Sequence, residues 1–114
     1  MIRVIMQRRA DGPIAAFSVS GHARYDRSGR DIVCAGVSAV TVGTVNAVET
    51  LTGVELPSTM EHGLLRVKVP DGLAPELDEK VQLLLESMLV MIDSIREEYG
   101  RYIDVQHQVI ENRR

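Results

Sequence analysis

The chain of 114 residues contains a single cysteine, Cys34, and this scarcity excludes several kinds of site. One cysteine cannot form an intramolecular disulfide, nor a zinc or iron–sulfur centre that needs several thiolates. The sequence also lacks a run close to the roughly eighteen apolar residues that span a membrane, and no signal-peptide-like stretch precedes its first arginines. We therefore expect a cytoplasmic protein without membrane association, whose one free thiol needs an explanation.

An excess of positive charge is also missing. Thirteen lysines and arginines stand against sixteen aspartates and glutamates, which gives a formal net charge of −3. Proteins that bind nucleic acid by its backbone usually present a basic face, so this balance argues against nucleic-acid binding. Apolar residues make up 45 % and charged residues 25 % of the chain, as in ordinary globular proteins. We expect one domain over residues 1–114 with a substantial core.

The hydrophobic pattern predicts an α/β fold of the α+β kind. Three- and four-residue steps predict a helix over about 35–51, although its valines and threonines favour strand by propensity. A clear apolar stripe with an acidic first turn predicts a second helix over 75–99. Alternating apolar residues predict strands over 2–7, 14–20, 64–69 and 102–110. The order is strand, strand, helix, strand, helix, strand: one sheet of about four strands with two helices.

The single thiol lies at or just before the start of the first predicted helix. There, unpaired backbone N–H groups and the helix dipole favour an anion. A free cysteine is often only a small buried hydrophobe, and for Cys34 alone that interpretation remains open. A model thiol has a pKa of roughly 8.5, and a helix N-terminus lowers a pKa by about one unit at best, so an activated cysteine usually needs a cation beside it.

His22 is the candidate for that neighbour. It follows Gly21 at the end of a predicted strand, and eleven residues (23–33) separate it from Cys34, enough for the chain to fold back. A histidine can both stabilise a thiolate and later protonate a leaving group. The pair therefore predicts a cysteine nucleophile with a histidine base.

Other polar residues near this pair have two interpretations each. Asp31 could orient the His22 ring, or it could cap the helix, and both remain open. Ser38, one helical turn beyond Cys34, could touch a substrate or be a small helix residue. His62 and His107 have no partners at metal-ligand spacing, so we predict no metal site. No phosphate-binding glycine loop is present, and we predict no cofactor.

The segment 21–40 resembles the signature of a known family, the ribosomal-processing cysteine proteases called Prp. It reads GHARYDRSGRDIVCAGVSAV, and the similarity continues through GTVNAV at 43–48. The combination of Gly-His-Ala, the Asp-Ile-Val-Cys-Ala segment at this distance and the Val-Asn-Ala continuation is specific. Length and element order fit over nearly the whole chain. One departure is Val37, where the family commonly has alanine, and it should affect packing more than chemistry.

The resemblance implies a cysteine endopeptidase that acts during ribosome maturation. Such enzymes remove the N-terminal extension of a bacterial large-subunit ribosomal protein, the twenty-seventh, cutting after an aromatic-rich motif and before a basic stretch. The resemblance implies that Cys34 is the nucleophile, that His22 is the general base and that Asp31 is a candidate third catalytic member. It also implies a mobile loop at 23–33 and a homodimer.

Supporting roles follow for a few neighbours of the pair. Backbone N–H groups around Cys34 and Ala35 at the helix start would hold the oxyanion. Gly29 would let the loop close over a bound peptide, and Gly21 precedes the base.

Two other functions remain as alternatives. In a non-catalytic ribosome- or RNA-associated dimeric binding protein, Cys34 would be buried and inert, and the loop arginines Arg24, Arg27 and Arg30 would bind RNA. A thiol redox sensor would need a resolving cysteine, which this sequence lacks.

Overall fold

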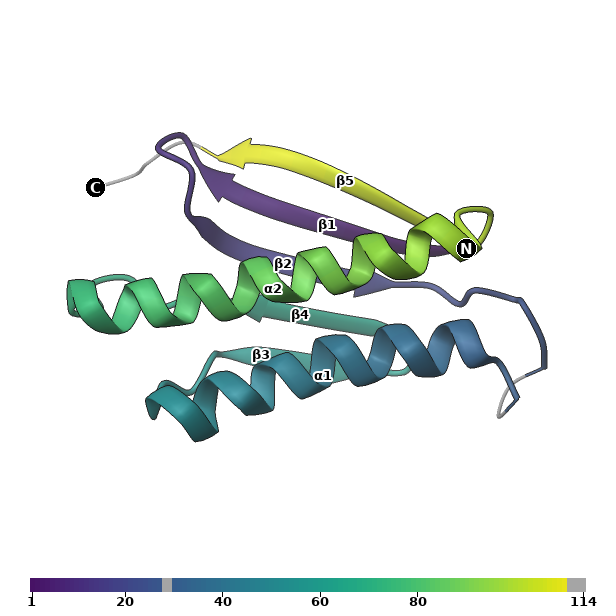
Figure 1. The fold of residues 1–114 in the computed structure, drawn as a ribbon, viewed down its shortest axis with the longest axis horizontal. Helices are drawn as coiled ribbons and strands as arrows, with labels where there is room; N and C mark the ends of the chain where they lie inside the picture. The colour runs from purple at the N-terminus through teal and green to yellow at the C-terminus, as the bar shows by residue number, and fades with distance from the viewer. Residues whose placement is uncertain (28–29, 111–114) are drawn as a thin grey trace.

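The computed structural model describes residues 1–27 and 30–110 and has an α+β architecture, the class expected from the sequence (Figure 1). Among these residues it has two helices and one mixed sheet of five strands, one more than the predicted number of about four. The elements are β1 (Ile2–Arg9), β2 (Ile14–Ser20), α1 (Ile32–Thr52), β3 (Ser58–Glu61), β4 (Leu64–Lys68), α2 (Pro75–Tyr99) and β5 (Ile103–Ile110).

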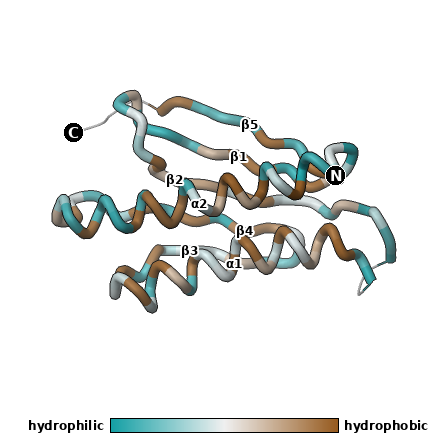
Figure 2. Tube along the Cα trace, in the orientation of Figure 1, coloured by the Kyte–Doolittle hydropathy of each residue, from teal (hydrophilic) through white to brown (hydrophobic). Residues whose placement is uncertain are grey.

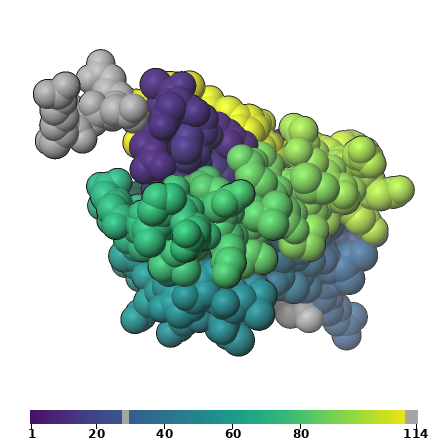
Figure 3. Space-filling model, turned by 60° about the vertical axis from the view of Figure 1, so that its left-hand side comes forward, coloured from purple at the N-terminus to yellow at the C-terminus, as the bar shows by residue number. Residues whose placement is uncertain are grey.

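The strands are arranged in the order β3-β4-β2-β1-β5. Neighbouring strands are antiparallel except β1 and β5, which run parallel from the pair Ile2 and Ile103 to the pair Arg9 and Ile110. Both helices cross the same face of the sheet (Figure 1), and α2 packs against α1 in the space-filling view (Figure 3). The molecule is therefore a two-layer sandwich with one sheet face uncovered.

The core lies between the sheet and the two helices. Successive side chains of β1 point to opposite faces of the sheet, and Ile2, Val4 and Met6 are buried on the face that the helices cover. The hydropathy view shows apolar positions along both helices (Figure 2). The buried helix residues are Val33, Val37, Thr41, Thr44 and Val48 of α1 and Val81, Leu85, Met88, Leu89 and Ile92 of α2.

Helix α1 contributes two threonines to the core. Thr41 and Thr44 are buried, but each hydroxyl donates to the carbonyl of the residue four positions earlier, at 2.9 and 2.6 Å, so neither polar group is left unpaired. By length and composition α1 could also cross a membrane, with a mean hydropathy of 1.5. A core helix meets the same test, and α1 packs one side against the sheet and α2.

The predicted helices differ from the observed ones only at the start of α1. It begins at Ile32, about three residues earlier than predicted, because Asp31 accepts hydrogen bonds from the backbone of Val33 and Cys34. It ends at Thr52 and is capped by Gly53, whose left-handed backbone lets its N–H donate to the Glu49 carbonyl. The bounds of α2 agree with the prediction.

Strand β3 is the element that the sequence did not reveal. All four of its side chains are exposed, so it has no alternation of apolar and polar residues. It exists through its antiparallel backbone pairing with β4, and a two-residue turn at 62–63 joins the two strands. This turn lies beside the candidate active site.

Candidate active site

Cys34 is the third residue of α1 and is partly buried. Its sulfur accepts a hydrogen bond from the backbone N–H of Ala23, with an N to Sγ distance of 3.3 Å. Ala23 directly follows His22, so the loop folds back onto the helix start as the spacing predicted. A backbone donor to sulfur stabilises the thiolate form of a cysteine.

His22 and Cys34 line one open cavity of about 570 Å³. A volume of this size lies within the range of roughly 300–1,000 Å³ that is typical of ligand pockets. Its lining includes side chains of both charges, and a smaller cavity of about 190 Å³ also touches His22 and Cys34. The larger cavity is lined by His22, Arg24, Asp26, Asp31, Cys34, Ala35, Ser38 and His62.

The backbone of His22 is fixed from two sides. Its carbonyl accepts a hydrogen bond of 2.6 Å from the amino group of Met1. Gly21 has a φ of +84°, and a Cβ at this position would collide with the Met1 carbonyl. The Gly21 N–H donates to the carbonyl of Gly63 in the β3–β4 turn, at 2.9 Å. The end of β2 is thus held between the start of β1 and that turn, and only glycine fits at position 21.

Asp31 acts as a helix cap and loop anchor in the structure. One carboxylate oxygen accepts from the backbone N–H groups of Val33 and Cys34, both at 3.0 Å, and the other from Tyr25 and Asp26, at 2.9 and 3.3 Å. Burial alone would raise the pKa of this carboxyl, but the four N–H donors together lower the pKa below its ordinary value. Within the described residues none of its hydrogen bonds reaches His22, so the cap is the interpretation that the geometry supports.

The predicted oxyanion donors are not free in this structure. The N–H of Cys34 donates to the Asp31 side chain, and the N–H of Ala35 donates to the Asp31 carbonyl at 3.0 Å, as helix geometry requires. The role of Ala35 as an oxyanion donor stays a prediction, since in this structure its N–H belongs to the first turn of the helix. Ala35 and Ser38 do line the cavity. Gly29 lies outside the described residues.

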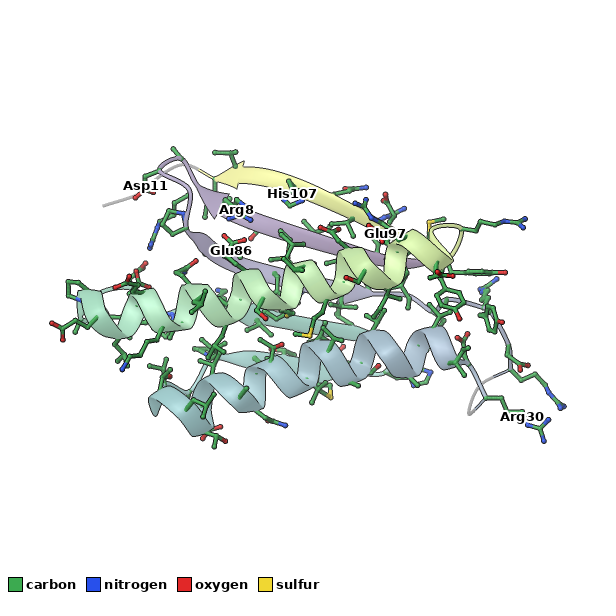
Figure 4. The ribbon with its side chains drawn as sticks, viewed as in Figure 1. Arg8, Asp11, Arg30, Glu86, Glu97 and His107 are labelled. Atoms are coloured by element: carbon green, nitrogen blue, oxygen red, sulfur yellow. The ribbon has the colours of Figure 1, made fainter. Side chains whose placement is uncertain are left out.

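Tyr25 connects the loop after His22 to the C-terminal end of α2. Its ring makes edge contacts with Tyr99, at the end of α2, and with Tyr102, with centroid distances of 5.6 and 5.3 Å. Together with the backbone bond to Asp31, these contacts hold the loop at Tyr25. Arg30 extends away from the body of the molecule (Figure 4).

His62 is the site residue that sequence reasoning missed. Its ring centroid lies 5.1 Å from that of His22, with the two planes tilted by 43°. Its place depends on the pairing of β3 with β4, which the hydrophobic pattern of the sequence does not predict. His107, by contrast, lies on β5 near Arg8 and Glu86, away from the cavity (Figure 4). Across residues 1–27 and 30–110, no three His, Cys, Asp or Glu side chains are placed to hold a metal ion.

Comparison with known proteins decides the family. The model of the family described as "Cysteine protease Prp" matches residues 1–104 of the chain. The chain belongs to the Prp family. A curated relative, the ribosomal processing cysteine protease Prp of Bacillus subtilis (strain 168), is 38 % identical over 112 residues, which is 96 % of this chain and all of the relative. The Prp of Staphylococcus aureus (strain Mu50) is 34 % identical and covers 95 % of this chain and all of its own.

Solved structures of Prp proteins share the fold. Crystal structures of the S. aureus Prp with a covalently linked product peptide and with a substrate peptide superpose with TM-scores of 0.85 and 0.81, at 34 % and 32 % identity. Each covers 95 % of this chain and 100 % of the S. aureus chain. A Streptococcus mutans protein has a TM-score of 0.82 at 30 % identity over 96 % of both chains. The chain is therefore a cysteine protease of Prp type, and the non-catalytic and redox-sensor alternatives are set aside.

Proposed function

We propose that this Prp-family protease removes the N-terminal extension of the twenty-seventh protein of the large ribosomal subunit, with Cys34 as nucleophile and His22 as base. One observation carries the residue assignment: the single cysteine of this cysteine-protease fold lines a cavity with His22, and its sulfur accepts the N–H of Ala23, the residue after His22. The relatives named as ribosomal processing proteases support the substrate class. The peptide complexes of the S. aureus protein support a peptide substrate.

The reaction is acyl transfer. His22 takes the thiol proton, the Cys34 sulfur attacks the scissile carbonyl, and His22 then protonates the departing amine. Water activated by His22 attacks the thioester and releases the new carboxyl end, which restores the thiol. The Ala23 N–H donates to the Cys34 sulfur, and Cys34 lies in the first turn of α1, so both fix the position of the nucleophile.

Substitution of the pair tests this assignment. Cys34→Ala should abolish cleavage of the extended ribosomal protein, followed by mass spectrometry, and His22→Ala should lower it at least about 100-fold. His107→Ala is the matched control because its histidine is exposed and lies outside the cavity. Cleavage at the normal rate by either of the first two variants would refute the mechanism.

Alkylation of the thiol gives an independent test. The half-buried Cys34 lines an open cavity, so iodoacetamide should reach it in the folded protein. The alkylation rate at neutral pH should fall in His22→Ala and stay unchanged in His107→Ala. An equal alkylation rate in the wild type and both variants would show that His22 does not activate the Cys34 thiol.

We further propose a cytoplasmic homodimer. The single free thiol suits a reducing compartment. An apolar groove of about 300 Å³ lies between the helices, next to the exposed side chain of Met91, and is a candidate dimer surface. Light scattering coupled to size exclusion should give twice the chain mass for the wild type and a monomer for Met91→Glu. A wild-type monomer at micromolar concentration would exclude the dimer.

A further inference from the structure

The orientation of the His22 ring needs an explanation that Asp31 does not give. Both Asp31 oxygens accept backbone hydrogen bonds. In the part of the chain that the structure describes, neither ring nitrogen of His22 has a hydrogen-bond partner. A base whose ring is free to turn would spend little time in the geometry that proton transfer from the Cys34 sulfur requires. Some other contact must restrict the ring.

The β3–β4 turn makes that contact. A Cβ added at Gly63 would lie 3.0 Å from Nε2 of His22 and 3.5 Å from Cε1, so the imidazole occupies the space that a side chain at position 63 would need. The preceding residue, His62, places its own ring 5.1 Å from that of His22. Two consecutive residues of one turn thus pack on the same catalytic side chain.

The distance between turn and ring is set by the backbone. The Gly63 carbonyl accepts from the N–H of Gly21, the residue before His22, at 2.9 Å. The turn is closed by the antiparallel pair of Glu61 and Leu64, and it requires a φ of +74° at Gly63. Because β4 pairs in turn with β2, the turn and His22 belong to one continuous hydrogen-bonded sheet.

We propose that the β3–β4 turn is the positioning element of the catalytic histidine, with Gly63 and His62 as positioning residues that act through the His22 ring. This proposal rests on the role of His22 proposed above. It gives the short, fully exposed strand β3 a purpose, because β3 presents the turn without contributing to the core.

The first test replaces Gly63 and uses Gly72 as a matched control. Both glycines lie in turns with nearly equal left-handed φ values, +74° and +73°, but a Cβ at Gly72 meets no atom within 4 Å. Both alanine variants should therefore lose thermal stability through the strained φ, and only Gly63→Ala also presses on the His22 ring. Gly63→Ala should also lower kcat about ten-fold with KM unchanged, because a ring shifted by a few tenths of an ångström is misaligned. If Gly63→Ala keeps the kcat of Gly72→Ala, the proposal is overturned.

The second test asks whether the His62 ring itself matters. His62→Ala should lower kcat about three-fold, since it removes one aromatic contact. His62→Phe should restore kcat because it keeps a ring, whereas His62→Gln should not. Thr59→Ala, at an exposed position on the same strand, should leave kcat unchanged. A Phe variant no better than the Ala variant would exclude ring packing as the cause.

A His22→Ala reference separates the two proposals. If His22→Ala retains kcat on a peptide spanning the ribosomal-protein cleavage site, the proposed function is wrong. If His22→Ala loses activity while Gly63→Ala retains it, His22 is catalytic and only the positioning role of the turn is refuted.

Discussion

The two ends of the sandwich are held together by different kinds of contact. Where β1 turns into β2, long side chains join the sheet to α2: Arg8 makes two hydrogen bonds to Glu86, at 2.6 and 2.8 Å (Figure 4). Gln82 also bonds both the N–H and the carbonyl of Ile14, at 2.8 and 2.9 Å. Two layers are thereby connected at several separate points.

At the opposite end, where β2 leads to α1, one carboxylate does most of this work. Asp31 accepts four backbone N–H groups, and a single ring, Tyr25, contacts α2. The first end is therefore joined by long side chains that link sheet and helix, whereas at the opposite end one carboxylate gathers the backbone N–H groups of the loop and of the helix start. Binding and catalytic loops commonly lie on such a rigid scaffold.

Loss of the Asp31 carboxylate should have the largest effect. Asp31→Ala removes the cap of α1 and leaves loop N–H groups without an acceptor, so we expect a loss of about 3 kcal/mol in unfolding free energy and of most activity. Urea denaturation with a parallel cleavage assay measures both. Asp31→Asn, which keeps one carbonyl acceptor, should lose about half as much. A loss below about 0.5 kcal/mol for the alanine variant would contradict the cap role.

At the end where β1 turns into β2, Gln82→Ala should cost stability without costing activity. The variant leaves two polar groups of Ile14 unpaired at a fully buried position, which should lower the unfolding free energy by about 1–3 kcal/mol. The kcat should stay at the wild-type value. The unfolding free energy of Gln82→Glu, whose side chain can accept but not donate, should lie between those of the wild type and Gln82→Ala. A clear drop in kcat would show that the two ends are coupled.

Acid should reduce the stability that Glu86 and Asp31 contribute at the two ends, and added salt should affect the two contributions differently. The hydrogen bond from Arg8 lowers the pKa of Glu86, against the opposing effect of burial, and backbone donors lower the pKa of Asp31. A folded pKa below the unfolded value gives stability that is present above about pH 4 and lost as pH falls through the folded pKa.

The measurement is the unfolding free energy from pH 6 to pH 2. The differences between wild type and Asp31→Asn, and between wild type and Glu86→Gln, should each be about 1 kcal/mol at pH 6 and shrink in acid. Added salt should reduce the Glu86 difference more, because the Arg8–Glu86 ion pair is only partly buried and Asp31 is buried. If the differences in unfolding free energy stayed constant down to pH 2, protonation of Asp31 and Glu86 would not be coupled to unfolding.

The smallest change in global stability should come from Tyr25. Its ring is 43 % exposed, so Tyr25→Leu should lower the unfolding free energy by less than about 1 kcal/mol. Trypsin, however, should cut the loop at Arg24 or Arg27 several times faster, because local opening becomes easier. Tyr25→Phe keeps the ring and should behave as wild type. Equal cleavage rates for all three would mean that the tyrosine contacts do not hold the loop.

The sequence was sufficient where a pattern is local. Helix α2 was predicted with its observed bounds because a proline at the start, a long apolar stripe and Gly100 lie within one segment. The loop that returns from His22 to Cys34 was also predictable, since it depends only on chain length and the helix start.

Non-local pairing set the limit. Strand β3 was missed because its four side chains are exposed and only backbone bonds to β4 define it. His62 was missed for the same reason: its neighbour His22 is forty residues away in sequence and adjacent only through the sheet. The choice between cap and orienting residue for Asp31 likewise depended on where the loop amides lie, which no spacing rule gives.

The parallel pairing of β1 with β5 has a consequence for how the enzyme comes into being. Every residue of β1 finds its partner about a hundred positions later in the chain, as for Gln7 and Gln108. During synthesis, β1 leaves the ribosome first and waits for nearly the whole chain before this edge of its backbone is paired. Contacts so distant in sequence form slowly. The sheet is therefore completed only when its last strand has been made, so the fold of this protease closes by joining its first and last strands.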